Sequence, residues 1–132
     1  MFRISNIEEI NEEYGRKTGN ETIIQVANKI RDSIAKDYIF VRYMGPKFVI
    51  VFSGVKKDDV VEYIEDLKKD TEELEIEEVI DDDENQEVRY IKPTLNFVIS
   101  TYYKGTGMES VLKKMEEFLD NAEKSESDIS YI

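Results

Sequence analysis

The sequence contains no cysteine, no histidine and no tryptophan, and only two prolines and six glycines among 132 residues. Without cysteine the chain has no disulfide framework and no thiol chemistry, which favours a cytoplasmic location. Without histidine it lacks the commonest general base near neutral pH. No apolar run approaches the length that spans a membrane, and the first residues do not resemble a signal peptide. These absences exclude the enzyme classes that depend on cysteine or histidine.

Basic residues are also scarce, because 18 Lys and Arg stand against 30 Asp and Glu, giving a net charge of −12. This charge opposes binding to nucleic acid and docking on an anionic membrane, so we expect neither partner. It also raises the cost of capturing a nucleoside triphosphate unless local cations or a metal compensate. At 40% hydrophobic and 36% charged residues, a chain of this length is predicted to form a single globular domain.

The chain is organised around a predicted β-hairpin over residues 38–53. Its two apolar runs flank the turn Met44-Gly45-Pro46-Lys47. We expect both strands to be central in the sheet, because the run from Phe48 to Phe52 is apolar on both faces. The turn contains no carboxylate, so its side chains cannot bind a divalent metal.

Hydrophobic spacing predicts the remaining elements. Helices are expected over residues 7–14, 20–34, 57–72 and 108–124, with Asn20 as the N-cap of the second. Further strands are expected over 2–5, 75–80, 88–90 and 95–103, and the tail 125–132 is expected to be loosely held. The order of elements predicts the α+β class, as a ferredoxin-like or palm-type sandwich with a mainly antiparallel sheet flanked by helices.

Two other features have ordinary structural interpretations. The acidic cluster over residues 81–84 lacks the spaced ligands and glycine of a calcium loop, so we expect a solvated turn. Five tyrosines are expected to pack on the sheet rather than to stack on bases, namely Tyr38, Tyr43, Tyr90, Tyr102 and Tyr103.

Four segments carry a resemblance to a known family. Residues 10–20 (INEEYGRKTGN) resemble the IND-x-YGH-xx-GD segment of GGDEF domains, the diguanylate cyclases, and residues 42–48 (RYMGPKF) align with the RYGGDEF signature hairpin. Residues 93–100 (PTLNFVIS) and 115–124 (MEEFLDNAEK) are similar to the family's TVSIGIA strand and ADEALYRAK helix. The four matches occur in the family's order and spacing, so the resemblance implies the GGDEF fold over the whole chain.

The resemblance implies a reaction that joins two GTP molecules into cyclic di-GMP, with two Mg²⁺ or Mn²⁺ ions held by carboxylates. The positions that would supply those carboxylates are Arg3 and Pro46, and the next acidic position of the signature is Lys47. A cation in such a pocket repels the metal. Lys47 is expected to be a solvated lysine at the hairpin tip, with phosphate contact as the alternative. Arg3 is expected to pair with Glu8 or Glu9, with phosphate contact again the alternative.

The family's other phosphate and regulatory groups are also changed. Its phosphate-binding lysine and arginine fall at Glu123 and about Ser127, with Lys124 one place out of register. The Arg-x-x-Asp motif of product inhibition is absent from residues 35–38 and from the rest of the chain. We therefore expect a degenerate signature turn (Met44, Gly45, Pro46, Lys47, Phe48), no catalytic residue, no metal and no cofactor.

The guanine end of the family's site is better preserved. The resemblance assigns base recognition to Asn11 and Asn20. Both residues also have simpler interpretations, because Asn20 is expected to cap a helix and Asn11 to bond loop backbone.

These observations predict a catalytically inactive GGDEF-like domain that regulates or docks through its surfaces, as a homodimer or with a protein partner. The alternatives are a GTP-binding sensor without turnover and a residual diguanylate cyclase. The helix and wide turn that precede the family's first strand are missing. Either the sequence is a piece of a longer signalling protein, which we favour and which could be membrane-anchored, or the surface left uncovered is a partner site.

Overall fold

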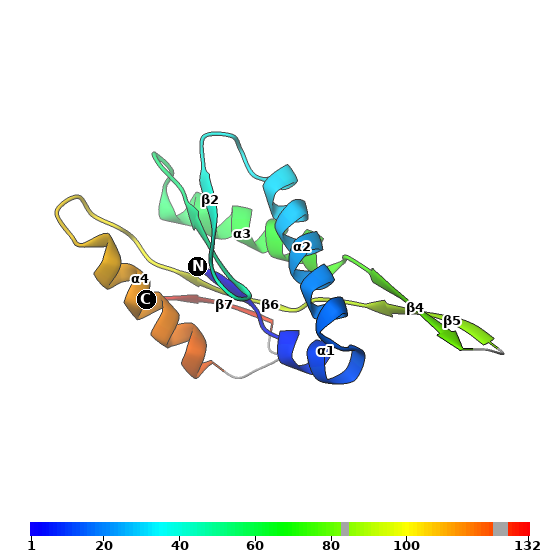
Figure 1. The fold of residues 1–132 in the computed structure, drawn as a ribbon. Helices are drawn as coiled ribbons and strands as arrows, with labels where there is room; N and C mark the ends of the chain where they lie inside the picture. The colour runs from blue at the N-terminus through cyan, green and yellow to red at the C-terminus, as the bar shows by residue number, and fades with distance from the viewer. Residues whose placement is uncertain (83–84, 123–126) are drawn as a thin grey trace.

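The structure, a computed structural model, describes residues 1–82, 85–122 and 127–132. Its helices are α1 (Ile7–Tyr14), α2 (Arg16–Ser33), α3 (Lys57–Glu72) and α4 (Met108–Asn121). Its strands are β1 (Phe2–Ile4), β2 (Ile39–Met44), β3 (Lys47–Val51), β4 (Ile76–Asp82), β5 (Asn85–Ile91), β6 (Leu95–Ile99) and β7 (Asp128–Tyr131). Figure 1 shows this α+β arrangement, which confirms the predicted fold class.

The main sheet has five strands in the order β2-β3-β1-β6-β7. β1 lies at its centre, where Phe2 is the register partner of both Phe48 and Phe97. All pairs are antiparallel except β6 with β7. The expectation that both hairpin strands are central is wrong, because β2 is an edge strand. β3 is central, as its apolar residues predicted. Of the two hairpin strands, it alone has a neighbouring strand on each side.

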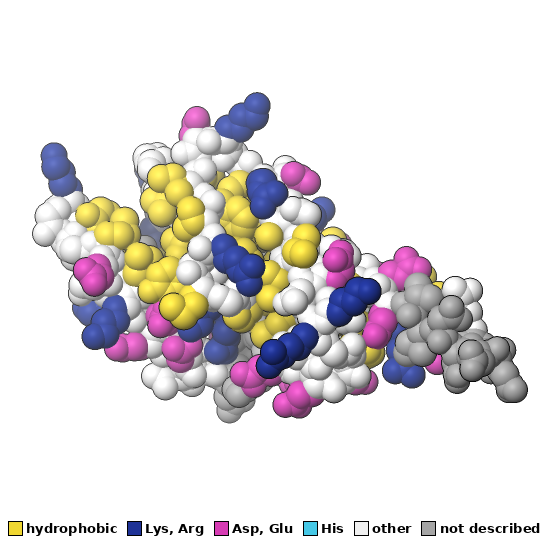
Figure 2. Space-filling model, viewed as in Figure 1, with side chains coloured by type: hydrophobic (Ala, Val, Ile, Leu, Met, Phe, Trp, Pro, Cys, Tyr) yellow, Lys and Arg dark blue, Asp and Glu magenta, His cyan; other side chains and the backbone are white. Residues whose placement is uncertain are grey.

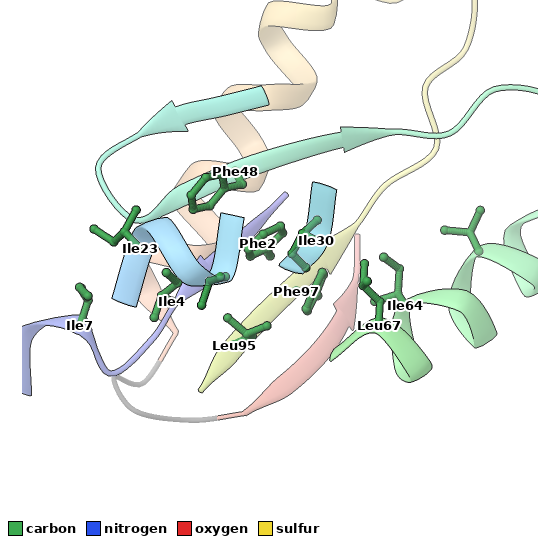
Figure 3. Close-up of a cluster of buried hydrophobic side chains, with 12 residues drawn as sticks. Phe2, Ile4, Ile7, Ile23, Ile30, Phe48, Ile64, Leu67, Leu95 and Phe97 are labelled. Atoms are coloured by element: carbon green, nitrogen blue, oxygen red, sulfur yellow. The ribbon is translucent and has the colours of Figure 1, made fainter. Parts of the chain in front are cut away.

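The two faces of the sheet bury different clusters. One cluster, shown in Figure 3, joins Phe2 and the neighbouring strands to side chains of α2 and α3, such as Ile30 and Ile64. The other cluster joins Met1, Val49 and Val98 to Met115 and Leu119 of α4. Successive strand residues point to opposite faces, so Met1 and Phe2 belong to different clusters. The sheet is thus covered by α2 and α3 on one face and by α4 on the other.

β4 and β5 form a separate antiparallel ribbon, which projects from the body of the molecule (Figure 1). Its base is held by Ile76 and Ile91, which pack with Ile10 of α1. The strands predicted over 75–80 and 88–90 are therefore present, although outside the main sheet. Of the predicted acidic turn, Asp81 and Asp82 belong to β4, and residues 83–84 fall outside the described residues.

Three predicted boundaries need correction. α2 begins at Arg16, because Gly15, with a positive φ of 91, is the one residue that separates it from α1. Asn20 therefore lies inside a helix and is not an N-cap. The strand predicted to reach residue 103 ends at Ile99, and the helix predicted to reach residue 124 ends at Asn121, with Ala122 in an extended conformation after it.

The tail was also predicted wrongly, because residues 128–131 form β7 beside β6. Ile129 packs against the cluster of the α2–α3 face, which holds this strand in place. Of the five tyrosines expected to pack on the sheet, Tyr38 contacts Phe52 and Tyr63. The other four are exposed, at Tyr43, Tyr90, Tyr102 and Tyr103. No helix among the described residues is long and apolar enough to cross a membrane.

Candidate functional site

The residues that replace the inferred metal ligands lie side by side. The antiparallel register of β1 and β3 pairs Arg3 with Lys47, and the backbone N–H of Ile4 donates to the Pro46 carbonyl at 3.1 Å. The turn is fixed from the other strand, because Arg42 Nε donates to the Gly45 carbonyl at 2.8 Å. The structure therefore confirms that Arg3 of β1 lies beside the signature turn, as the family resemblance predicted.

Both cations turn toward the C-terminal end of α4. Lys47 Nζ lies 2.6 Å from Asp120 Oδ1, and the Lys47 side chain is only 13% exposed. Arg3 Nη2 donates to the Ala122 carbonyl at 3.5 Å. Cations are stabilised at this end of a helix by its free carbonyls and by the helix dipole. Lys47 is thus a helix-anchoring residue, and the prediction of a solvated hairpin-tip lysine is wrong. The pairing of Arg3 with Glu8 or Glu9 stays a prediction.

A tyrosine and a second carboxylate complete this cluster. Tyr43 of β2 lies near Glu116 of α4, and desolvation followed by the Glu116 charge raises the pKa of Tyr43. Within the described ranges, Arg3 Nε and Glu116 Oε2 are buried without a hydrogen-bond partner. We call Arg3, Tyr43, Lys47, Glu116 and Asp120 the strand–helix cluster. Glu116 and Asp120 lie in the segment 115–124 that resembles the family's last helix, but the sequence analysis did not single them out as site residues.

The strand–helix cluster does not fit a pair of divalent cations. Magnesium requires oxygen ligands in a near-octahedral arrangement, yet the two strand positions present Arg3 and Pro46. Asp120 is already paired with Lys47. Over the residues that the structure describes, no group of three or more Asp, Glu, His or Cys side chains could hold a metal ion. The chemistry of these residues is that of an ion-paired contact between strand and helix.

The predicted guanine contacts lie where α1 and α2 meet. The Asn11 carbonyl accepts the Gly15 N–H at 2.9 Å and so ends α1. The Asn11 side chain lies against Gly19, since a Cβ built on Gly19 would overlap Asn11 Oδ1. Asn20 is exposed on α2. Gly19 was not singled out from the sequence, although its place in the GGDEF-like segment marks a close helix contact. Base recognition by Asn11 and Asn20 stays a prediction.

Two further predicted positions fall outside the described residues, namely Glu123 and Lys124. Ser127, the third phosphate position, donates its hydroxyl to Glu72 Oε1 of α3 at 2.8 Å. Glu72 also accepts the backbone N–H of Leu95 at 2.8 Å. Ser127 therefore joins β7 to α3 and β6, and this contact has a structural role.

Comparison with known proteins agrees with this geometry. The family model of the diguanylate cyclase GGDEF domain matches residues 1–128. The chain is a GGDEF domain. Its match to the family model covers the signature turn and both asparagines. A comparison with curated proteins gives no significant match.

Solved structures share the fold of this GGDEF domain at low sequence identity. Diguanylate cyclase SiaD of Pseudomonas aeruginosa, in complex with its activator SiaC, has a TM-score of 0.79 at 11% identity, over 99% of this chain and 48% of SiaD. The GGDEF domain of DgcB from Caulobacter crescentus, in complex with c-di-GMP, has a TM-score of 0.70 at 17% identity, over 98% of this chain and 74% of that chain. An active GGEEF domain from Vibrio cholerae has a TM-score of 0.68 at 15% identity, over 98% and 78%. The chain thus spans about half the length of SiaD.

Proposed function

We propose that the chain is a catalytically inactive GGDEF domain that acts in cyclic di-GMP signalling, in the cytoplasm, as a regulatory or interaction module. The observation that carries the proposal is that Arg3 and Pro46 occupy the inferred metal positions, with Lys47 beside Pro46 and paired with Asp120. At 4 Å and an effective dielectric constant of 20, a unit cation repels a divalent ion by about 8 kcal/mol. In the strand–helix cluster the charges of Arg3 and Lys47 balance those of Glu116 and Asp120, so no net negative charge is left to offset this repulsion.

The strand–helix cluster also supports the proposed regulatory or interaction role. Arg3 and Lys47 hold the end of α4 against the sheet, so the positions that once served catalysis now serve the fold. A domain of this kind acts through its surfaces, by dimerising or by docking another protein. The complex of the fold neighbour SiaD with an activator protein supports a protein partner for this chain as well.

The test is turnover of GTP by the purified protein with Mg²⁺ or Mn²⁺, followed by chromatography of the nucleotides. We expect no cyclic di-GMP under conditions in which an active GGEEF domain converts its substrate. The matched variant Arg3→Asp with Pro46→Glu and Lys47→Glu tests whether the residues at the ligand positions alone account for the loss of cyclase activity. Sustained product formation by the unmodified chain would show a residual cyclase and would end the proposal.

A second candidate function is a guanine-nucleotide sensor without turnover. The half-buried side chain of Asn11 supports it, because its contact with Gly19 keeps the α1–α2 junction in place. Calorimetric titration with GTP and GDP tests this candidate. Asn11→Ala is expected to abolish the binding heat, whereas Asn121→Ala at the end of α4 is expected to leave it unchanged. The sensor is excluded if GTP at near-millimolar concentration gives no heat.

A further inference from the structure

The outer edge of β2 is open. β2 is the last strand of the main sheet on one side, and no strand among the described residues pairs with its outer edge. On its inner side Ile39 pairs with Val51 and Arg42 with Phe48, so alternate backbone N–H and C=O groups of β2 point away from the sheet. Open edges are templates for another chain, and proteins usually protect them with lysine or proline. Residues 39–43 contain neither.

The face of this edge on the α4 side is apolar. β2 presents the exposed side chains of Ile39, Val41 and Tyr43 there. Val41 is the register partner of Val49, which belongs to the cluster beneath α4. Figure 2 shows hydrophobic side chains gathered over β2 and β3 and toward α4. Because successive side chains of a strand point to opposite faces, this face favours an apolar residue at every second position of an added strand.

The face on the α2 side is cationic. A cavity of about 260 Å³ lies there between β2 and α2. Its charged lining residues are Arg42 of β2 and Arg31 of α2, beside Asn28 and a set of apolar side chains. The described residues around this cavity include no Asp or Glu. In a chain of net charge −12, this face therefore favours an acidic residue at the intervening positions of an added strand.

Both arginines retain N–H groups that can bind a carboxylate. Arg42 Nε donates to the Gly45 carbonyl at 2.8 Å, and Arg31 Nη1 donates to Asn28 Oδ1 at 3.1 Å. Within the described ranges, no ion pair joins either guanidinium to a carboxylate. A guanidinium has five N–H donors in a planar fork that matches a carboxylate. Each arginine therefore has donors left for an acidic side chain.

We propose that the outer edge of β2 binds an extended segment of a partner protein in which apolar and acidic residues alternate. The segment lies beside β2 and adds to the sheet. Its apolar side chains cover Ile39, Val41 and Tyr43, and its acidic side chains pair with Arg31 and Arg42. This mode of recognition is strand addition, in which main-chain hydrogen bonds supply affinity and the alternate side chains supply specificity.

A second copy of the chain fits this edge less well. Antiparallel pairing of two β2 strands centred on Val41 would place Arg42 opposite Phe40, and would bring Arg31 and Arg42 of both copies onto one face. Like charges on neighbouring strands destabilise a sheet. A segment with acidic residues replaces this repulsion with attraction, so charge favours a different protein over self-association.

The inference rests on the interaction role proposed above, and it does not depend on whether the domain converts GTP. Binding at β2 and turnover of GTP are measured separately, the second on protein without peptide. A failure of peptide binding therefore leaves the proposed inactivity unaffected, and cyclic di-GMP formation would leave the proposed binding edge unaffected.

The test uses the blocked peptide acetyl-VEVEVEV-amide at about 0.15 M salt, where charges more than about 8 Å away are largely screened. Calorimetry measures its affinity, and NMR follows the amide exchange of residues 39–43. We expect saturable binding and at least tenfold slower exchange at the outward amides of this stretch. Acetyl-VKVKVKV-amide is expected to bind at least tenfold more weakly. The same loss is expected for the acidic peptide methylated on every backbone nitrogen, because it has no main-chain donors.

A pair of valine variants locates the apolar contact. Val41→Lys places a charge in the apolar face of β2 and is expected to weaken binding of the acidic peptide at least tenfold. Val88→Lys lies on the ribbon strand β5, where the valine is similarly exposed, at 41% against 47% for Val41. It is expected to change the affinity less than twofold.

A pair of double variants tests the cationic face. Arg31→Gln with Arg42→Gln is expected to weaken binding of the acidic peptide at least tenfold and to reduce its advantage over the lysine peptide. Arg16→Gln with Lys17→Gln removes the same charge from exposed positions at the start of α2, outside the cavity lining. This control is expected to change the affinity less than twofold. Circular dichroism of all variants checks that each is folded.

Three results would overturn the proposal. The first is no saturable binding at millimolar acidic peptide, and the second is equal binding of the lysine peptide or of the methylated peptide. The third is protection of residues 39–43 in the protein alone that rises with its concentration, together with a dimer in analytical ultracentrifugation. That result would assign the edge of β2 to a second copy of the chain.

Discussion

Among the residues that the structure describes, one face of the sheet carries a cluster of twelve buried hydrophobic residues and the other a cluster of five. The first face is closed by two helices, α2 and α3. The second has only α4, and it leaves Ile39 and Val41 of β2 exposed at 57% and 47%. The same strands supply both faces, so the difference comes from the helices. We infer that the α2–α3 face provides most of the stability and that the α4 face is available for interaction.

The largest expected effect is on the α2–α3 face. Phe2 is fully buried and its ring lies 4.8 Å from that of Phe97 and 5.1 Å from that of Phe48. Phe2→Ala is expected to lower the free energy of unfolding by about 3–5 kcal/mol. Leu119→Ala on the α4 face is expected to cost about 2–3 kcal/mol, because fewer neighbours surround the cavity. Denaturant titration measures both, and an equal or larger loss for Leu119→Ala would contradict the comparison.

The second effect depends on pH and on the buried amino group of the α4 face. The Met1 amino group has a pKa of 8.0 when unfolded and about 5 when folded. Between these values the unfolded chain binds more protons, so the amino group makes stability rise with pH from 5 to 8. Its contribution is fully present above pH 8 and is lost as the pH falls toward 5, by at most about 4 kcal/mol.

N-terminal acetylation removes this titration while leaving every carboxylate in place. The difference in unfolding free energy between acetylated and unmodified protein, measured from pH 5 to 8, isolates the effect. A difference that does not change with pH would mean that the amino group is solvated in the folded protein.

The third prediction compares the replacement of glycine by alanine at two positions. In Gly19→Ala the new Cβ would overlap Asn11 Oδ1 between α1 and α2, and the expected cost is about 1–3 kcal/mol. At Gly107, before α4, nothing lies within 4 Å of the added atom. Gly107→Ala is therefore expected to cost less than about 1 kcal/mol. Thermal unfolding compares the two, and adding Asn11→Ala to Gly19→Ala is expected to recover part of the loss.

The smallest effect concerns the ion pair between Lys47 and Asp120. A double-mutant cycle with Lys47→Met and Asp120→Asn is expected to give a coupling energy of about 0.5–1 kcal/mol, because Asp120 is 51% exposed. The coupling should fall in 1 M NaCl, which screens the charges. A coupling of zero at low salt would remove the anchoring role assigned to Lys47.

The sequence was most informative where hydrophobic spacing is strong. α1 and α3 have the predicted bounds, and α4 begins at the predicted Met108. Rules based on local sequence failed where a single residue or a distant strand determines the secondary structure. Asn20 satisfied the rule for an N-cap, but Gly15 at positive φ allowed α2 to begin four residues earlier. β7 has too few apolar residues for a local prediction, and it forms because β6 offers an edge 29 or more residues away.

The candidate site was predicted in part. The family resemblance placed Arg3 beside the signature turn, and the β1–β3 register confirms that neighbourhood. It could not indicate that Lys47 reaches Asp120, because the approach of α4 depends on packing between Leu119 and the sheet. Side-chain partners across layers are set by tertiary packing, which no pattern within a single segment records.

The central position of β1 has a consequence for how the protein is made. β1 is synthesised before both of its neighbours in the sheet, β3 and β6, and Met1 meets its partner Val98 across 97 residues of sequence. Until β6 has been synthesised, the nascent chain holds an apolar strand without a second neighbour. The sheet therefore closes late during synthesis, and incomplete chains expose strand edges that are prone to aggregate.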